Sequence, residues 1–231
     1  MFADPLQNVS GVRPDGRSGT LRGPGAAAGH STSDELIEFL TTISAQIAGN
    51  VIPGAIIFLC LDWRYLEELA VATRRYFGKA RDLVVWCKTD ATRGSFYRSQ
   101  HEHIAVYVAG TTPSAKTPLH GRGRYRSNVW TGYHMPGRGP KQKPVALIVD
   151  AIRDCSKRGD TVLDPFAGLG TTMIAAERTG RRARLIEIDP ACCDLIVRRW
   201  QALGGKAPQL AESNEAFAEV ERRRRADGAR R

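Results

Sequence analysis

The sequence lacks any segment long and apolar enough to cross a membrane. Its longest apolar run covers residues 55–61 of a 231-residue chain, whereas a spanning helix needs roughly 20 apolar residues. Residues 1–5 do not combine a basic stretch with a following apolar one, so no secretion signal is indicated. We therefore predict a protein of the cytoplasm with no membrane partner.

The chain has few cysteines, and their spacing excludes a small protein stabilised by disulfides or by zinc. The chain has five cysteines, an odd number, at positions 60, 87, 155, 192 and 193. They form neither a disulfide framework nor the spacing of a zinc site. His101 and His103 lie two residues apart without a third ligand at a fixed spacing. We predict reduced thiols and no bound metal ion.

Acidic residues are absent from one long stretch of an otherwise basic chain. The whole sequence has 34 Lys and Arg against 24 Asp and Glu, a formal net charge of +10, and residues 103–149 contain no Asp or Glu at all. A local excess of positive charge favours a polyanionic partner. The alternative is that the charge serves solubility alone.

The remaining chain alternates between helical and extended patterns. A helix over 34–48, capped by Ser33 or Asp34, is predicted by apolar residues three or four positions apart, namely Leu36, Ile37, Leu40, Ile43 and Ile47. Further strands are expected at 54–62, 83–87, 103–108, 161–164 and 184–188, and further helices at 63–77, 144–155, 171–179 and 190–203. Residues 8–33 and 110–140, rich in Gly and Pro, are expected to be irregular. This alternation predicts an α/β fold.

A glycine-rich turn follows the strand expected at 161–164. Gly168 and Gly170 stand where a buried strand turns into a helix, so the backbone can approach a ligand closely. A dinucleotide fingerprint would need a third glycine where Met173 stands, and no Gly-Lys-Thr or Gly-Lys-Ser of a P-loop follows. The turn therefore indicates neither NAD nor a nucleoside triphosphate.

Two carboxylates accompany this turn. Asp164 ends one strand, and Glu187 follows 23 residues later at the end of the next, near the roughly 20 residues expected for a ribose-binding acid. A ligand with an ammonium group and a ribose suits both acids, and S-adenosylmethionine (SAM) is such a ligand. The alternatives are that Asp164 only caps the next helix and that Glu187 is an exposed strand end. Asp189, before Pro190, is interpreted as a helix cap.

Five segments together resemble the DNA amino-methyltransferases that modify adenine N6 or cytosine N4, in the order where the catalytic motif precedes the cofactor motif. The resemblance covers residues 1 to about 210. The segments are 94–102 (Gly-Ser-Phe-Tyr-Arg-Ser-Gln-His-Glu), 126–130 (Arg-Ser-Asn-Val-Trp), Lys143-Pro144, 164–172 and 186–190.

The resemblance implies a Rossmann-like SAM-dependent methyltransferase fold, with a mostly parallel seven-stranded sheet and helices on both faces. It implies a methyltransferase domain over 1–211, with a basic target-recognition insert at 111–141, and an Arg-rich tail over 212–231. The residues that it assigns to SAM are Lys143, Asp164, Phe166, Gly168, Gly170, Thr171 and Glu187.

The catalytic motif of the family is Asp-Pro-Pro-Tyr, and this chain has Asp4-Pro5-Leu6-Gln7 in its place. The Asp4 carboxylate and the Pro5 carbonyl are expected to hold the hydrogens of the target amine. The base must first leave the duplex, and an aromatic ring normally stacks on it. Gln7 has no ring, so the second hypothesis is a degenerate remnant that binds cofactor or DNA with weak or no turnover.

The expected partner is double-stranded DNA, which the insert is predicted to contact through Arg122, Arg124, Arg126 and Arg138. The alternative is a solvated basic loop. No cysteine follows a proline, which excludes the thiolate chemistry of C5-cytosine methylation. We expect adenine N6 as the target ahead of cytosine N4, with a homodimer and a cognate restriction endonuclease as further partners. An RNA or small-molecule methyltransferase is a more distant alternative.

Overall fold

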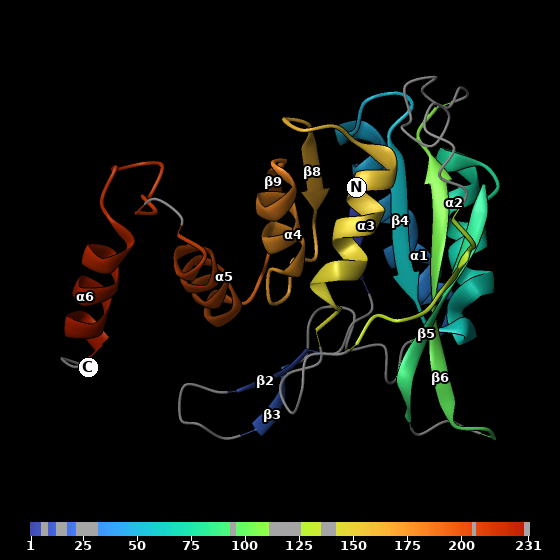
Figure 1. The fold of residues 1–231 in the computed structure, drawn as a ribbon, viewed down its shortest axis with the longest axis horizontal. Helices are drawn as coiled ribbons and strands as arrows, with labels where there is room; N and C mark the ends of the chain where they lie inside the picture. The colour runs from blue at the N-terminus through green and yellow to red at the C-terminus, as the bar shows by residue number, and fades with distance from the viewer. Residues whose placement is uncertain are drawn as a thin grey trace.

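The computed structural model describes residues 1–5, 9–12, 18–21, 32–92, 96–110, 126–134, 142–204 and 207–228. The first half contains β1 (Phe2–Ala3), β2 (Val9–Val12), β3 (Ser18–Leu21), α1 (Ser33–Asn50), β4 (Ile56–Leu61), the 3₁₀ helix η2 (Trp63–Tyr65), α2 (Leu66–Phe77), β5 (Asp82–Thr92) and β6 (Ser99–Val108). The second half contains β7 (Val129–Trp130), α3 (Val145–Cys155), β8 (Thr161–Asp164), α4 (Thr171–Thr179), β9 (Arg182–Leu185), α5 (Pro190–Ala202) and α6 (Phe217–Gly228). Figure 1 shows their arrangement, and the predicted α/β alternation is confirmed.

Two helix starts illustrate how local sequence places the elements. The N-cap of α1 is Thr32, whose hydroxyl accepts from the Glu35 amide while the Glu35 carboxylate accepts from the Thr32 amide. The prediction of Ser33 or Asp34 as the cap was therefore wrong, because this reciprocal capping box satisfies two free amides at once. Asp189 caps α5 before Pro190, as predicted.

The main sheet has five strands in the order β1-β4-β6-β5-β7. Strand β6 runs antiparallel to both of its neighbours, whereas β1 with β4 and β5 with β7 are parallel pairs. Strands β8 and β9 form a separate parallel pair. The arrows of β4 and β8 point the same way in Figure 1, so their carboxyl ends share one edge of the molecule.

The seven-stranded sheet predicted from the resemblance is not formed as one ladder. Strand β1 lies beside β8, but it has only two residues, and these pair with β4 in the register Phe2↔Phe58 and Ala3↔Leu59. No ladder joins β1 to β8 within the described residues, so the β8–β9 pair continues the sheet by packing instead of by hydrogen bonds.

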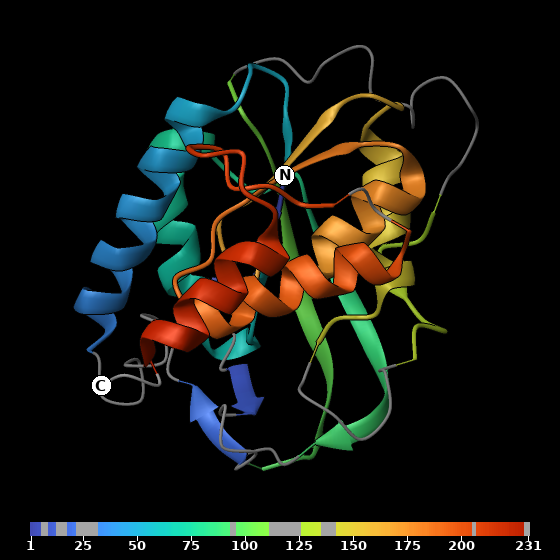
Figure 2. The same ribbon diagram turned by 90° about the vertical axis from the view of Figure 1, so that its left-hand side faces the viewer.

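Helices cover both faces of the main sheet, as predicted (Figure 2). One core places α1 and α2 against alternate β4 residues Ile57, Leu59 and Leu61. The other core packs α3 and α4 against Phe58 and Cys60, which point the opposite way. Burial on both faces explains the continuous apolar run of β4.

Two stretches expected to be irregular contain strands. Strands β2 and β3 form an antiparallel pair inside 8–33, and β7 lies inside 110–140. Strand β9 begins two residues before the predicted strand because β8 sets its register, Thr161↔Arg182. No helix in the described part of the chain is long and apolar enough to cross a membrane.

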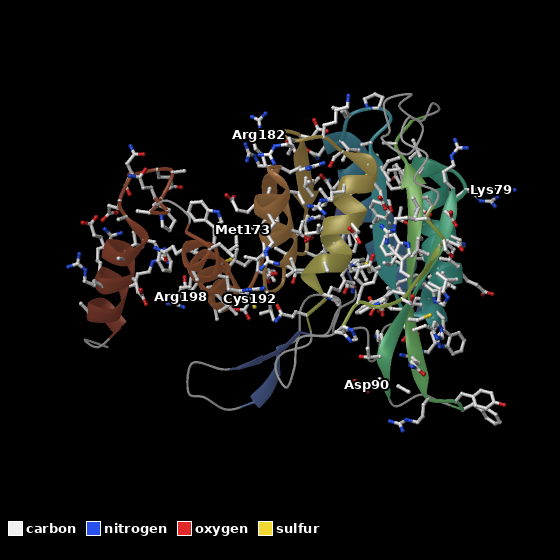
Figure 3. All side chains as sticks on the ribbon, in the orientation of Figure 1. Lys79, Asp90, Met173, Arg182, Cys192 and Arg198 are labelled. Carbon is white, nitrogen blue, oxygen red and sulfur yellow. The ribbon has the colours of Figure 1, made fainter. Side chains whose placement is uncertain are left out.

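Strands β5 and β6 extend past the carboxyl edge of the sheet. Leu61, the last residue of β4, pairs with His103, so β6 residues 99–102 lie beyond the end of β4 and pair only with β5. We call residues 87–92 and 96–101 the β5–β6 arm. Figure 3 labels Asp90 on this arm, and it labels Arg182, at the start of β9, near the opposite edge of the molecule.

Candidate active site

Acidic side chains from three strands meet at the carboxyl edge. Asp4 follows β1, Asp164 ends β8, and Glu187 lies two residues after β9. A small pocket is lined by Phe2, Asp4, Gln142, Lys143, Ile148, Asp164, Phe166, Ala167, Leu169, Thr171 and Thr172. The structure thus brings Asp4 and the glycine turn together, although 160 positions separate Asp4 from Asp164 in the sequence.

The glycine turn owes its shape to two left-handed residues. Gly168 has φ 52° and Gly170, the residue before α4, has φ 75°. A side chain at Gly170 would also place Cβ 2.8 Å from Cγ1 of Ile196 on α5. Gly170 therefore allows α5 to pack closely, so its requirement for glycine is explained within the protein.

Glu187 is tied to the same turn through backbone amides. Its Oε2 accepts from the Gly168 amide at 2.7 Å, and its Oε1 accepts from the Asp189 amide at 3.0 Å. The side chain is half-buried. Each carboxylate oxygen can accept a further hydrogen bond, so Glu187 can still bind the hydroxyls of a ribose.

Asp164 is buried, and the described groups that donate hydrogen bonds to its side chain are uncharged. Its Oδ2 accepts from the Thr172 hydroxyl at 2.5 Å and its Oδ1 from the Phe166 amide at 3.0 Å. Burial raises the pKa of Asp164 to about 6, and these two hydrogen bonds lower it only in part. No Lys or Arg of the described residues forms an ion pair with Asp164. The site therefore offers a buried carboxylate that a cationic ligand can neutralise.

Asp4, in contrast, has a lysine beside it. Lys143, whose side chain is 6% exposed, donates from Nζ to Oδ2 of Asp4 at 2.5 Å and also to Oε1 of Glu102. Lys88 approaches the other oxygen of Glu102 at 3.1 Å. Oδ1 of Asp4 accepts no hydrogen bond from any described residue.

The pKa values of this group follow from two carboxylates sharing one lysine. Burial by itself lowers the pKa of Lys143, but the charges of Asp4, Cys60 and Glu102 raise it well above the ordinary value. Burial raises the pKa of Asp4 against the effect of Lys143. Burial also acts to raise the pKa of Glu102, but Lys143 and Lys88 together lower it. Glu102 contacts both Lys143 and Lys88, whereas Asp4 contacts Lys143, and the pKa of Asp4 is raised while that of Glu102 is lowered.

The other residues predicted to bind SAM lie close to the pocket. Phe166 and Thr171 line it, and the ring of Phe166 packs edge-on against Phe39 at 6.5 Å. Lys143 lines the pocket as well, but its ammonium group is held by two carboxylates. Pro5 is buried next to Asp4.

Arg126 is engaged inside the protein. Its guanidinium pairs with Asp154 at 2.5 Å, donates to the Tyr133 hydroxyl at 2.6 Å and stacks 4.5 Å from the centre of the Trp130 ring. These contacts occupy the group predicted to contact DNA. Arg122, Arg124 and Arg138 lie outside the described residues.

Sequence reasoning missed three residues of the site. Glu102 contacts the lysine that binds Asp4, and Lys88 contacts Glu102. Gln142 lines the pocket, and its buried Oε1 has no hydrogen-bond partner among the described residues. Glu102 stands between His101 and His103 and ends the 94–102 segment of the resemblance, but no role at the site was assigned to it. The available signal was an acidic residue directly before the strand expected at 103–108.

A larger cavity, of about 690 Å³, lies at the amino ends of the strands. Its lining includes Met1, Ile52, Asp160 and Arg182. Ligands of open α/β sheets bind outside the carboxyl ends of the strands, and none of Asp4, Asp164 and Glu187 lines this cavity. Within the described ranges, no three His, Cys, Asp or Glu side chains form a metal-binding group.

Known proteins share this sequence and this fold. The Type II methyltransferase M2.DpnII of Streptococcus pneumoniae is 36% identical over 142 residues, 62% of this chain and 50% of that protein. The chain spans about half the length of the curated relatives it matches.

Two solved structures share the fold at low sequence identity. The M1.HpyAVI–SAM complex has a TM-score of 0.57 at 19% identity, covering 74% of this chain and 96% of that one. PvuII DNA methyltransferase (cytosine-N4-specific) has a TM-score of 0.65 at 14% identity, covering 87% and 78%. These similarities confirm the methyltransferase fold class.

A family model described as DNA methylase, for N6 and N4 methyltransferases, matches residues 19–198. This match covers most of the chain, without the Asp4–Gln7 segment, and confirms the family that the resemblance indicated. The chain belongs to the N6/N4 DNA methylase family.

Proposed function

We propose that this protein transfers a methyl group from SAM to an exocyclic amine of a base in double-stranded DNA. The observation that carries the proposal is the shared pocket. Asp4, whose Oδ1 accepts no hydrogen bond from the described residues, lines the same pocket as Asp164 and the turn residues Ala167 and Leu169. A carboxylate that can hold the target amine therefore lies beside a site for the cationic methyl donor.

The residues present fit SAM. Asp164 offers a buried carboxylate without a cationic partner in the described chain, which suits an ammonium group. Glu187 offers two half-buried oxygens to ribose hydroxyls, and Phe166 offers an aromatic surface. The solved M1.HpyAVI complex contains SAM on the same fold. When bound, SAM supplies an electrophilic methyl group.

The chain's own residues act on the amine. Asp4 accepts a hydrogen bond from one N–H through Oδ1, and the Pro5 carbonyl is assigned the second N–H. Holding both hydrogens directs the nitrogen lone pair away from the ring, so it becomes nucleophilic. The raised pKa of Asp4 suits it to accept the proton that the methylated nitrogen must lose.

DNA contacts are assigned to two regions. The first is the basic insert, through Arg122, Arg124 and Arg138. The second is the tip of the β5–β6 arm, where the rings of Phe96 and Tyr97 are 87% and 83% exposed and pack edge-to-face at 4.8 Å. Exposed aromatic rings can stack on unpaired bases. Arg126 is left out because its guanidinium is already paired.

Adenine N6 is proposed ahead of cytosine N4 as the target. Digesting the methylated DNA to nucleosides and separating N6-methyl-2′-deoxyadenosine from N4-methyl-2′-deoxycytidine decides between them. The homodimer, the cognate endonuclease, the cytoplasmic location and the domain boundary at residues 211 and 212 stay predictions.

The test is incubation of the purified chain with labelled SAM and mixed-sequence duplex DNA. We expect label in the DNA, and none after the Asp4→Asn substitution. Retained SAM binding without transfer would favour the degenerate remnant. Label in RNA but not in DNA would favour the RNA methyltransferase.

A gain-of-function variant sharpens this test. Gln7 replaces the aromatic residue of the family motif, and base stacking is worth ~1–3 kcal/mol. Gln7→Tyr should therefore raise the transfer rate by about tenfold. An unchanged rate would show that lost stacking does not limit activity.

A further inference from the structure

Four side chains of alternating charge connect Asp4 to the β5–β6 arm. Lys143 contacts Asp4 and Glu102, and Glu102 contacts Lys88 in turn. We call these four residues the charge chain. All four side chains are at most 20% exposed, so solvent screens their interactions less than it would at the surface.

The fold places Glu102 here through strand register. Glu102 pairs with Trp86 on β5, one position beyond the end of the ladder with β4. Lys88 lies two positions after Trp86, and its Nζ lies 5.4 Å from the centre of that ring. Residues two apart on a strand share a face, so Lys88 lies on the same side of the sheet as Trp86 and reaches the carboxylate of Glu102.

We propose that Glu102, supported by Lys88, is a positioning residue that centres Lys143 between two carboxylates and thereby sets the strength with which Lys143 holds Asp4. This inference rests on the proposed function for its rate measurement only. Glu102 does not line the pocket, so it acts on the target amine through Lys143 and Asp4.

The physical reason is a division of charge. If Asp4 were the only partner of Lys143, the ammonium group would interact with that carboxylate alone and make it a weaker proton acceptor. Glu102 forms a second ion pair with Lys143, so Lys143 stabilises the charged form of Asp4 less strongly. Lys88 pairs with Glu102 in turn and weakens the attraction of Glu102 for Lys143. The pKa of Asp4 is accordingly raised by Glu102 and lowered by Lys143 and Lys88.

Charged and titratable groups near Asp4 come from every neighbouring element. They are Lys143 before α3, Glu102 on β6, Lys88 on β5, Cys60 on β4 and Asp164 on β8. Burial raises the pKa of the Cys60 thiol well above its ordinary value, so it stays neutral. Asp164 is unchanged in every variant of the charge chain described below, so its effect on the pKa of Asp4 is the same in all of them.

The charge chain predicts opposite effects for two substitutions. Glu102→Gln removes the competing carboxylate, so the pKa of Asp4 should fall by about one pH unit. Lys88→Met leaves Glu102 more dependent on Lys143, so the pKa of Asp4 should rise. The Asp4 carboxyl is followed by ¹³C NMR titration of the full chain, and the transfer rate is measured against pH in parallel.

We expect the Asp4 midpoint and the acid limb of the rate profile to move down in Glu102→Gln and up in Lys88→Met. The control is Glu67→Gln on α2, an exposed position, which should move neither. Unchanged Asp4 midpoints, or shifts in the same direction, would overturn the inference. If Glu102→Gln does not fold, Lys88→Met alone decides by the direction of its shift.

The two proposals fail separately. A wild-type chain without transfer refutes the proposed function, while the NMR midpoints still test the charge chain. An active wild type with fixed midpoints refutes only the charge chain.

Discussion

Asp4 and Asp164 are two buried carboxylates that follow adjacent strands, yet they are held in different ways. Lys143 gives Asp4 a built-in cation, whereas Asp164 has hydroxyl and amide donors and no ion-pair partner in the described chain. A carboxylate that already has a cation can receive a neutral amine without losing its charge. A carboxylate that lacks one favours a cationic ligand. This difference fits the proposal that Asp4 holds the target amine and Asp164 holds the cationic methyl donor.

The largest expected effect separates these two roles at the Asp4 position. Asp4→Asn keeps the shape of the side chain but removes the charge that accepts the proton. The single-turnover transfer rate should fall about 10³-fold, while the dissociation constant of SAM, measured by calorimetry, stays unchanged. If SAM binding weakens in parallel with the rate, the division of roles is wrong.

The converse substitution tests Asp164. Asp164→Asn should weaken SAM binding by about 10- to 100-fold, because charge-assisted hydrogen bonds are worth more than neutral ones. Calorimetry measures the effect, with Asp34→Asn in the exposed first turn of α1 as the matched control. Unchanged affinity would assign Asp164 to capping and turn structure alone.

The pH dependence of SAM binding sharpens the contrast. The pKa of Asp164 is raised to about 6, so the carboxylate is ionised above that pH and protonated below it. The protonated form cannot neutralise a cation. SAM affinity should be flat between about pH 6 and pH 7, where the ammonium group of SAM is still protonated, and fall by up to about tenfold per pH unit below pH 6. Asp164→Asn should remove this dependence, and a wild-type affinity that is flat down to pH 5 would contradict it.

The smallest effect concerns the DNA side. Phe96→Ala should weaken DNA binding by about fivefold and leave SAM binding intact. Ile52→Ala is the matched control, because Ile52 is 77% exposed but lines the cavity at the opposite edge. Fluorescence anisotropy with a labelled duplex compares them. Equal losses in both variants would remove the arm from the DNA surface.

The arrangement of the proposed cofactor site was predictable because its residues are close in sequence. Asp164, the glycine turn and Glu187 lie within one β-turn-α-β unit, so strand and helix geometry places them together. Gly168 and Glu187 indeed share a hydrogen bond. The α1 cap was missed by one residue because Thr32, Ser33 and Asp34 are all good caps and only the Glu35 side chain selects Thr32.

The contacts of the residues proposed to bind the target base and DNA were predicted only in part. Asp4 was identified by its motif, but Lys143 was assigned to the cofactor because its partners are 139 and 41 positions away. Arg126 was assigned to DNA by its place in a basic run, whereas Asp154, Tyr133 and Trp130 surround it. Neither set of contacts follows from local spacing.

Periodicity and short motifs were sufficient for the α/β alternation, the glycine turn and its two acids, since each depends on backbone geometry within a few tens of residues. Which buried charged side chains form ion pairs depended on which strands lie side by side and in what register they pair. Placing Glu102 one position past β4 gave Lys143 a second carboxylate, and that placement exists only once the whole sheet has formed.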